Sequence, residues 1–231
     1  MPKSGGKKIY EVALARAQLE ALKVRMNPHF ISNALTSIRS MLYQDKKEEA
    51  IEYLTYFAKL IRKTLENATK EFITLATEIE YLTNYLEIEK LRFADKFETK
   101  IIVPVNVNAA DILIPPTILQ PYIENAINHG LMHRLTGGKL TISFEISENL
   151  LKCLIEDNGV GRKRASEFEL RSLSSHNSLS EQITLERISL FNKVFQTEDF
   201  AITTTDLYDD HGTPAGTRVH VQLPLQNIYQ L

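Results

Sequence analysis

A narrow apolar seam, interrupted once by a proline, is the feature of this 231-residue sequence that most restricts its fold. Apolar residues step by three and four positions from Val12 to Met26, which predicts a helix with one buried stripe. Pro28 lacks a backbone donor and crowds the Val24 carbonyl, so we expect the helix over residues 9–42 to bend there. Beyond the bend the seam shifts to Phe30, Ala34, Ile38 and Met41.

A second predicted helix comes after the polar turn at residues 44–47. Its apolar positions alternate in steps of three and four, at Ile51, Leu54, Ala58, Ile61 and Leu65. So narrow a seam is typical of helical bundles. The two helices form an antiparallel hairpin, and a hairpin alone cannot bury both faces. We therefore expect two copies of the chain to pair into a four-helix bundle.

His29 stands at the expected bend. The seam continues through Phe30 and leaves His29 aside, so we expect its imidazole to turn out of the core with one nitrogen free. A neutral imidazole is a usable nucleophile near neutral pH. The alternative is that Pro28 merely kinks the helix and that His29 is a polar residue near a seam.

Composition excludes several classes of function. The formal net charge of -2 gives no indication of general binding to nucleic acid or to a membrane surface. Cys153 is the only cysteine, which excludes an internal disulfide and a cysteine-based zinc site. There is no apolar stretch of about 18 residues and no signal peptide, so we expect a soluble chain.

The apolar pattern changes near residue 95. Before it, a third helix is predicted over residues 75–92, and it could pack on the hairpin or belong to the next domain. After it, strands are predicted at residues 97–107, 139–147, 150–156, 200–207 and 216–223, with helices at 116–131 and 183–195. The fold class is therefore α+β, with a mostly antiparallel sheet and helices on one face.

The first of two chemically informative stretches lies late in the helix predicted over residues 116–131. Asn125, Asn128 and His129 are three and four residues apart, which places them on one helical face. An asparagine carbonyl is an oxygen ligand suited to Mg²⁺, and the other polar groups can meet phosphate oxygens. The alternative is a solvated helix end.

The second stretch, Asp157-Asn158-Gly159-Val160-Gly161, comes directly after a strand. A carboxylate fixed at a strand end can accept a hydrogen bond from an exocyclic amine. Gly159 and Gly161 let the backbone pass close to a flat ring or adopt positive φ. The alternative is an ordinary strand-ending turn, for which Asp-Asn-Gly is a common signal.

In this order, the two stretches resemble the Bergerat ATP-binding fold of histidine kinases, gyrase-type ATPases, certain chaperones and mismatch-repair ATPases. The segment Gly216-Thr217-Arg218 before the last strand resembles the end of that domain. Asn27-Pro28-His29-Phe30 and the motifs at residues 85–92 and 116–130 narrow the resemblance to LytS-type sensor histidine kinases, over about residues 18–224.

This resemblance implies a protein histidine kinase that uses ATP and Mg²⁺. His29 would be the phosphoacceptor, Asn125 would hold Mg²⁺, and Asp157 would bind adenine. The ATP-binding residues expected on this basis are Asn125, Asn128, His129, Asp157, Gly159, Gly161, Arg187 and Thr217.

Family members usually have N-terminal transmembrane sensor segments and phosphorylate an aspartate of a response regulator. We therefore expect a homodimeric kinase core on the cytoplasmic side of the membrane, as part of a longer membrane sensor, with a receiver domain as partner. The expected domains are a tail at residues 1–8, a dimerisation and phosphoacceptor region at 9–70, a connecting helix at 71–95, and an ATP-binding domain at 96–226.

Two departures from the family pattern leave alternatives open. Many histidine kinases carry an acidic residue after the phosphoacceptor, where this chain has Phe30, so Glu124 becomes the candidate base. The segment before the Arg187 helix, residues 178–181, lacks the usual glycines. The alternatives are an ATPase module that performs no phosphotransfer, and a non-catalytic dimeric scaffold with a degenerate nucleotide lid.

Overall fold

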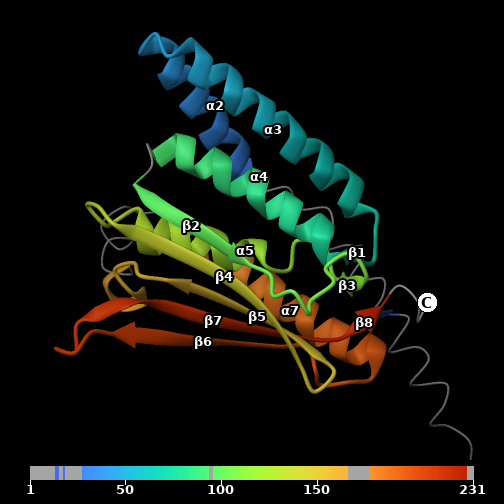
Figure 1. The fold of residues 1–231 in the computed structure, drawn as a ribbon. Helices are drawn as coiled ribbons and strands as arrows, with labels where there is room; N and C mark the ends of the chain where they lie inside the picture. The colour runs from blue at the N-terminus through green and yellow to red at the C-terminus, as the bar shows by residue number, and fades with distance from the viewer. Residues whose placement is uncertain (1–13, 16–17, 19–27, 94–95, 166–176, 228–231) are drawn as a thin grey trace, which may run out of the picture.

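The computed structural model describes residues 14–15, 18, 28–93, 96–165 and 177–227. Three helices, α2 to α4, lie beside the β2 edge of a five-stranded sheet, and helices α5 and α7 lie against one face of that sheet (Figure 1). The predicted α+β class, with N-terminal helices followed by an α/β sandwich, is confirmed. In the described ranges, no helix has the length and apolar character needed to cross a membrane.

Helix α2 (Pro28–Tyr43) begins at the proline. Proline is favoured at a first helical position because its missing N–H would have no intrahelical partner there. The shifted seam is confirmed, since Ala34, Ile38 and Met41 are buried and Phe30 packs against the core. The expected bend depends on residues 19–27, which lie outside the described residues.

Helix α3 (Lys47–Ala68) turns a different face inward from the predicted seam. Its buried positions include Ala50, Tyr53 and Leu60, and these face α2 and α4. In contrast, Ile51, Leu54 and Leu65 are 64%, 47% and 57% exposed. The seam is therefore uncovered in the single chain, as expected for a surface that a second copy would cover.

Helix α4 (Leu75–Phe93) lies between the helical hairpin and the rest of the chain. Leu75, Leu82 and Ile88 are fully buried, and the helix contacts α3 as well as β1, β2 and β3, so it packs on both parts of the chain. The ring of Phe30 in α2 meets Tyr85 of α4 and Phe57 of α3, with centroid distances of 5.7 and 5.9 Å.

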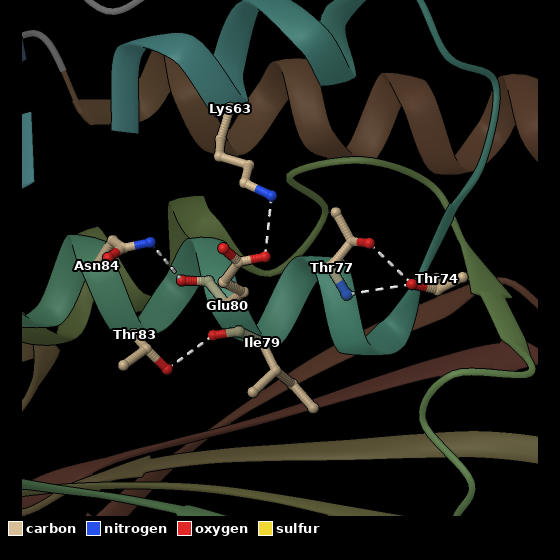
Figure 2. A network of polar contacts seen from close by, with 7 residues as sticks. All are labelled: Lys63, Thr74, Thr77, Ile79, Glu80, Thr83 and Asn84. Atoms are coloured by element: carbon tan, nitrogen blue, oxygen red, sulfur yellow. Dashed lines mark hydrogen bonds and ion pairs between the residues drawn. The ribbon is translucent and has the colours of Figure 1, made fainter. Parts of the chain in front are cut away.

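Figure 2 shows the outer side of the contact between α3 and α4. Lys63 Nζ lies 2.9 Å from Glu80 Oε2, and both side chains are partly exposed, so this ion pair contributes about 1 kcal/mol or less. Thr74 caps the first turn of α4, because its Oγ1 accepts the Thr77 N–H at 3.1 Å. The cap fixes where α4 begins.

The main sheet has the strand order β2-β4-β5-β7-β6. Its strands are β2 (Phe97–Ile102), β4 (Gly138–Ser147), β5 (Leu150–Asp157), β6 (Ala201–Tyr208) and β7 (Pro214–Pro224). The pairing of β2 with β4 is parallel and the other three are antiparallel. The predicted turn between β4 and β5 is confirmed, since Glu148 and Asn149 have φ of 55° and 65°, as in a type I′ hairpin.

A second, small sheet was not expected. It joins β1 (Ile73–Thr74), β3 (Ile112–Ile114) and β8 (Gln226–Asn227) in the order β1-β3-β8. The first predicted strand also ends earlier than expected, at Ile102, because Pro104 cannot donate to a ladder. The small sheet ties the start of α4 to the C-terminal end of the described chain.

Two predicted helix boundaries are wrong. The helix expected over residues 116–131 consists of α5 (Gln120–Asn125) followed by a π-helix, η1 (Ala126–Leu131), and Thr117 before it has φ of 55°. Helix α7 (Asn177–Phe195) starts before the expected residue 183, so residues 178–181 form its first turns instead of a preceding segment.

Candidate functional site

Asp157 ends strand β5 with its side chain only 4% exposed. Its Oδ1 accepts the Gly159 N–H at 2.7 Å, and the Thr217 N–H of β7 also bonds to the carboxylate. Burial raises the pKa of Asp157 to about 6, and the two backbone hydrogen bonds oppose that rise. A carboxylate so placed is ionised at neutral pH and is a fixed hydrogen-bond acceptor.

Glycines let the backbone close around this carboxylate. A Cβ on Gly130 would lie 2.7 Å from Asp157 Oδ1, and one on Gly159 would lie 2.6 Å from the same atom. The Val160 N–H donates to Gly130 O at 3.2 Å, which ties the loop after β5 to η1. Gly216, with φ of 139°, approaches the Asp157 backbone.

Gly130 and Gly216 were not among the predicted site residues, although both lie inside the motifs that were singled out. Gly161, which was predicted, has φ of 77°, and its missing Cβ faces Pro214. It therefore lets the loop after β5 pass close to Pro214 at the start of β7. Thr217, also predicted, pairs with Asp157 across the sheet.

Asn125, Asn128 and His129 are half-buried at the junction of α5 and η1. A π-helix bonds residue i to residue i+5, so residues four to five apart lie above one another. The backbone therefore aligns Asn125 with His129 and Gly130, and turns Asn128 partly aside. The predicted common face of all three residues assumed an uninterrupted α-helix. Short π-helices occur often at functional sites.

Arg187 lies at the other end of α5. It is 8% exposed, and its Nη2 donates to Pro116 O at 2.8 Å. Burial lowers its pKa, and the nearby Glu78 opposes that. Glu78 is fully buried and its Oε2 accepts the Thr117 N–H at 3.0 Å. These contacts of Arg187 anchor the start of α5, and Glu78, which sequence reasoning missed, shares that task.

Glu124 is half-buried in α5, on the side facing α4. Gln120 Nε2 donates to Glu124 Oε1 at 2.7 Å, and the Tyr81 hydroxyl donates to Gln120 Oε1 at 2.7 Å. The electrostatic neighbours of Glu124 on α4 are Tyr81, Tyr85 and Glu89. The predicted base therefore sits where α5 meets the helical region.

His29 lies in the first turn of α2, and its side chain is outside what is described. The next residue, Phe30, contacts Tyr85, so the start of α2 adjoins the part of α4 that faces Glu124. The structure thus groups Asp157, Gly159, Gly161 and Thr217 with Gly130 of η1, and brings the start of α2 toward α4. The hydrogen bond of Arg187 goes to Pro116 O, and Glu78 lies near its guanidinium.

Comparison with known proteins finds similarity to histidine kinases. A sequence model of the histidine kinase family matches residues 17–97. Sensor histidine kinase BtsS of Escherichia coli (strain K12) is 37% identical over 145 residues, which are 63% of this chain and 25% of BtsS. Sensor protein LytS of Oceanobacillus iheyensis is 37% identical over 148 residues, 64% of this chain and 25% of that protein.

A further relative covers nearly the whole chain. Sensor protein LytS of Staphylococcus saprophyticus is 26% identical over 213 residues, 92% of this chain and 34% of that protein. The chain therefore spans between a quarter and about a third of the length of these curated relatives. The chain is thus similar to histidine kinases over residues 17–97, and over about two thirds of its length to the LytS-type sensor kinases BtsS and LytS.

Proposed function

We propose that this chain is the kinase core of a sensor of a two-component system, which transfers the γ-phosphoryl group of ATP to His29 and then to an aspartate of a response regulator. The observation that carries the proposal is the buried Asp157 carboxylate, enclosed by backbone at Gly130 and Gly159. Such an acceptor suits the exocyclic amine of adenine, and the glycines allow a flat ring to approach.

The remaining site residues have roles set by their chemistry. Asn128 and His129 would meet phosphate oxygens, Gly161 and Thr217 would complete the adenine end, and Arg187 would support the site by holding the start of α5. Among the described residues no three His, Cys, Asp or Glu side chains gather to hold a metal. Mg²⁺ would be held by the Asn125 amide oxygen together with phosphate oxygens and water, where it would offset phosphate charge.

Glu124 is the proposed base. The reaction forms a bond between phosphorus and a ring nitrogen of His29, breaks the bond from phosphorus to the departing ADP oxygen, and moves the imidazole proton to a carboxylate. Phosphoryl transfer of this kind depends mainly on positioning and charge neutralisation. The start of α2 and Glu124 both adjoin Tyr85 of α4, which supports this assignment.

The working unit is proposed to be a homodimer. The exposed apolar residues of α3 continue across the hairpin, where Leu35 and Leu42 of α2 are 59% and 54% exposed. Two hairpins placed against each other would bury both stripes in a four-helix bundle. The dimerisation region is proposed at residues 9–70, the connecting helix at 71–95 and the ATP-binding domain at 96–226. A receiver domain is the proposed partner, and the cytoplasmic side of a membrane sensor the proposed location.

Incubation with labelled ATP and Mg²⁺ tests the function. We expect an acid-labile, alkali-stable phosphoryl group, which His29→Gln abolishes while nucleotide binding remains. His211→Gln, in the exposed turn between β6 and β7, is the matched control and should label normally. Label that persists in His29→Gln would refute the phosphoacceptor. ATP hydrolysis without label would favour the ATPase module, and no nucleotide binding at all would favour the scaffold.

A further inference from the structure

A chain of hydrogen bonds crosses from α4 into α5 and ends on the proposed base. The Tyr81 hydroxyl donates to Gln120 Oε1 and Gln120 Nε2 donates to Glu124 Oε1, each at 2.7 Å. Tyr81 is only 2% exposed, and Gln120 and Glu124 are half-buried. At these lengths and this burial, both hydrogen bonds are well formed and little weakened by water.

The chemistry of the three side chains determines which group donates and which accepts in each hydrogen bond. An ionised carboxylate can only accept hydrogen bonds, so Gln120 must turn its NH₂ group toward Glu124. Its carbonyl oxygen is then left for Tyr81, whose hydroxyl must donate. If the Gln120 amide were reversed, its carbonyl oxygen would face the carboxylate, which is repulsive. Tyr81 therefore selects the amide orientation that serves Glu124.

This series of hydrogen bonds also lies next to the helical hairpin. Thr64 of α3 lies beside the Tyr81 hydroxyl, while its own hydroxyl donates to Leu60 O at 2.8 Å within α3. Three helices thus contribute in sequence: α3 through Thr64, α4 through Tyr81, and α5 through Gln120 and Glu124. A change in how α3 packs on α4 would reach Glu124 by moving Tyr81, and with it the two hydrogen bonds through Gln120.

We propose that Gln120 and Tyr81 are positioning residues that hold the Glu124 carboxylate in its working orientation and link it to α4, on which the helical hairpin packs. The proposal rests on the proposed function, in which Glu124 accepts the imidazole proton of His29. Neither residue has a hydrogen bond to the Asp157 pocket in the described part of the chain. Their loss should therefore slow phosphoryl transfer without weakening nucleotide binding, because catalysis is far more sensitive than binding to small displacements of a reacting group.

Autophosphorylation kinetics of the full chain, with Gln120→Leu, Tyr81→Phe and the double variant, test the proposal. For Gln120→Leu we expect kcat to fall about tenfold to a hundredfold, the range for losing a hydrogen bond to a charged group, with KM for ATP within about twofold of wild type. Tyr81→Phe should lower kcat by roughly threefold to tenfold. The double variant should equal Gln120→Leu, because Tyr81 acts only through Gln120.

Tyr53→Phe is the matched control, since it removes another buried tyrosine hydroxyl, from α3, and it should leave kcat unchanged. Tyr81→Phe in a Glu124→Gln background should also have no effect. An unchanged kcat in Gln120→Leu, or multiplicative effects in the double variant, would overturn the positioning role. If Glu124→Gln itself keeps the wild-type kcat, the proposed base is wrong instead, and that result does not depend on Gln120.

Discussion

Gly130 in η1 faces Asp157 at the end of β5 so closely that a Cβ on residue 130 would lie 2.7 Å from Asp157 Oδ1 and 3.2 Å from its Cγ. The helix and the strand end therefore form one wall of the proposed adenine site. The Gly159 N–H donates to the same Oδ1, so the carboxylate cannot move aside without losing that bond.

Gly130→Ala should therefore weaken ATP binding by about tenfold or more, because the new methyl group must displace the carboxylate. Calorimetric titration with a non-hydrolysable ATP analogue measures the change. The control is Gly212→Ala, which has φ of 74° but no atom within 4 Å of its Cβ position. It should lower stability slightly and leave affinity unchanged, and equal affinity in both variants would place the nucleotide elsewhere.

Nucleotide affinity should depend on the ionisation of Asp157. Its pKa is raised to about 6 by burial, so below that pH the carboxyl is protonated and no longer accepts from the adenine amine with both oxygens. We expect ADP affinity to fall as pH drops from 7 to 5. Because the ADP phosphates also titrate, the useful quantity is the ratio of wild-type to Asp157→Asn affinity. A ratio that stays constant with pH would contradict the adenine contact.

Local sequence signals predicted much of this fold. The burial of Ala34, Ile38 and Met41 is a consequence of helical spacing, and the hairpin at Glu148 and Asn149 is a consequence of turn chemistry. The Asp157 stretch was placed correctly at a strand end because Asp-Asn-Gly is a strong turn signal. Each of these features depends on a few residues that are neighbours in the sequence, so it can be predicted without knowledge of tertiary contacts.

The remaining features depend on contacts between distant segments. The π-helix at η1 places Gly130 against Asp157, and no spacing rule within residues 120–131 reveals that neighbour. The parallel pairing of β2 with β4 likewise depends on contacts between segments that are distant in the sequence. The family resemblance implied that Arg187 binds ATP, and the hydrogen bond of its side chain to Pro116 O, 71 residues away, could not be inferred from the sequence. The hydrogen-bond partner of a buried guanidinium is determined by tertiary packing.

Dimerisation should be separable from folding, because the α3 seam is exposed in the single chain. Leu54→Glu with Leu65→Glu places two charges on positions that are 47% and 57% exposed, so the monomer should fold normally. In a dimer both charges would be buried without partners, which is strongly unfavourable. Sedimentation should show a dimer for the wild type and a monomer for the variant.

The control for the seam variant is Lys100→Glu, which changes the charge by the same amount at an exposed position of strand β2, outside the helical hairpin. It should remain dimeric. A double variant that stays dimeric would show that another surface forms the interface, and a wild type that is monomeric at tens of micromolar, roughly where weak homodimers form, would contradict the proposal altogether.

The stability of the chain should fall as pH rises from 5 to 8, and Glu78 should account for a large share of that fall. Glu78 is fully buried, its Oε1 has no partner among the described residues, and burial raises its pKa from 4.5 to about 7. Because the folded pKa lies above the unfolded one, the folded state holds the proton more tightly. The stabilisation is complete below about pH 4.5 and is lost as pH rises through 7.

Glu78→Gln should therefore flatten the dependence of the unfolding free energy on pH. Between pH 4.5 and 7 the loss of unfolding free energy should shrink by at most on the order of 3 kcal/mol. Part of the slope must remain, because Glu89 and Asp157 have pKa values raised to about 7 and about 6 by burial and contribute with the same sign. The slope is a better measure than stability at one pH, because Gln also leaves the buried Arg187 without its nearby anion, which is destabilising.

Denaturant unfolding at pH 5, 6, 7 and 8 gives the slope. Glu80→Gln is the control, since Glu80 lies on the same helix but is 57% exposed and pairs with Lys63 at the surface, and it should leave the slope unchanged. An unaltered slope in Glu78→Gln would mean that Glu78 is ionised throughout this range, held so by Arg187. In that case the pair would anchor the start of α5 as two charges, and Arg187→Met should then cost far more stability at pH 7 than Glu78→Gln.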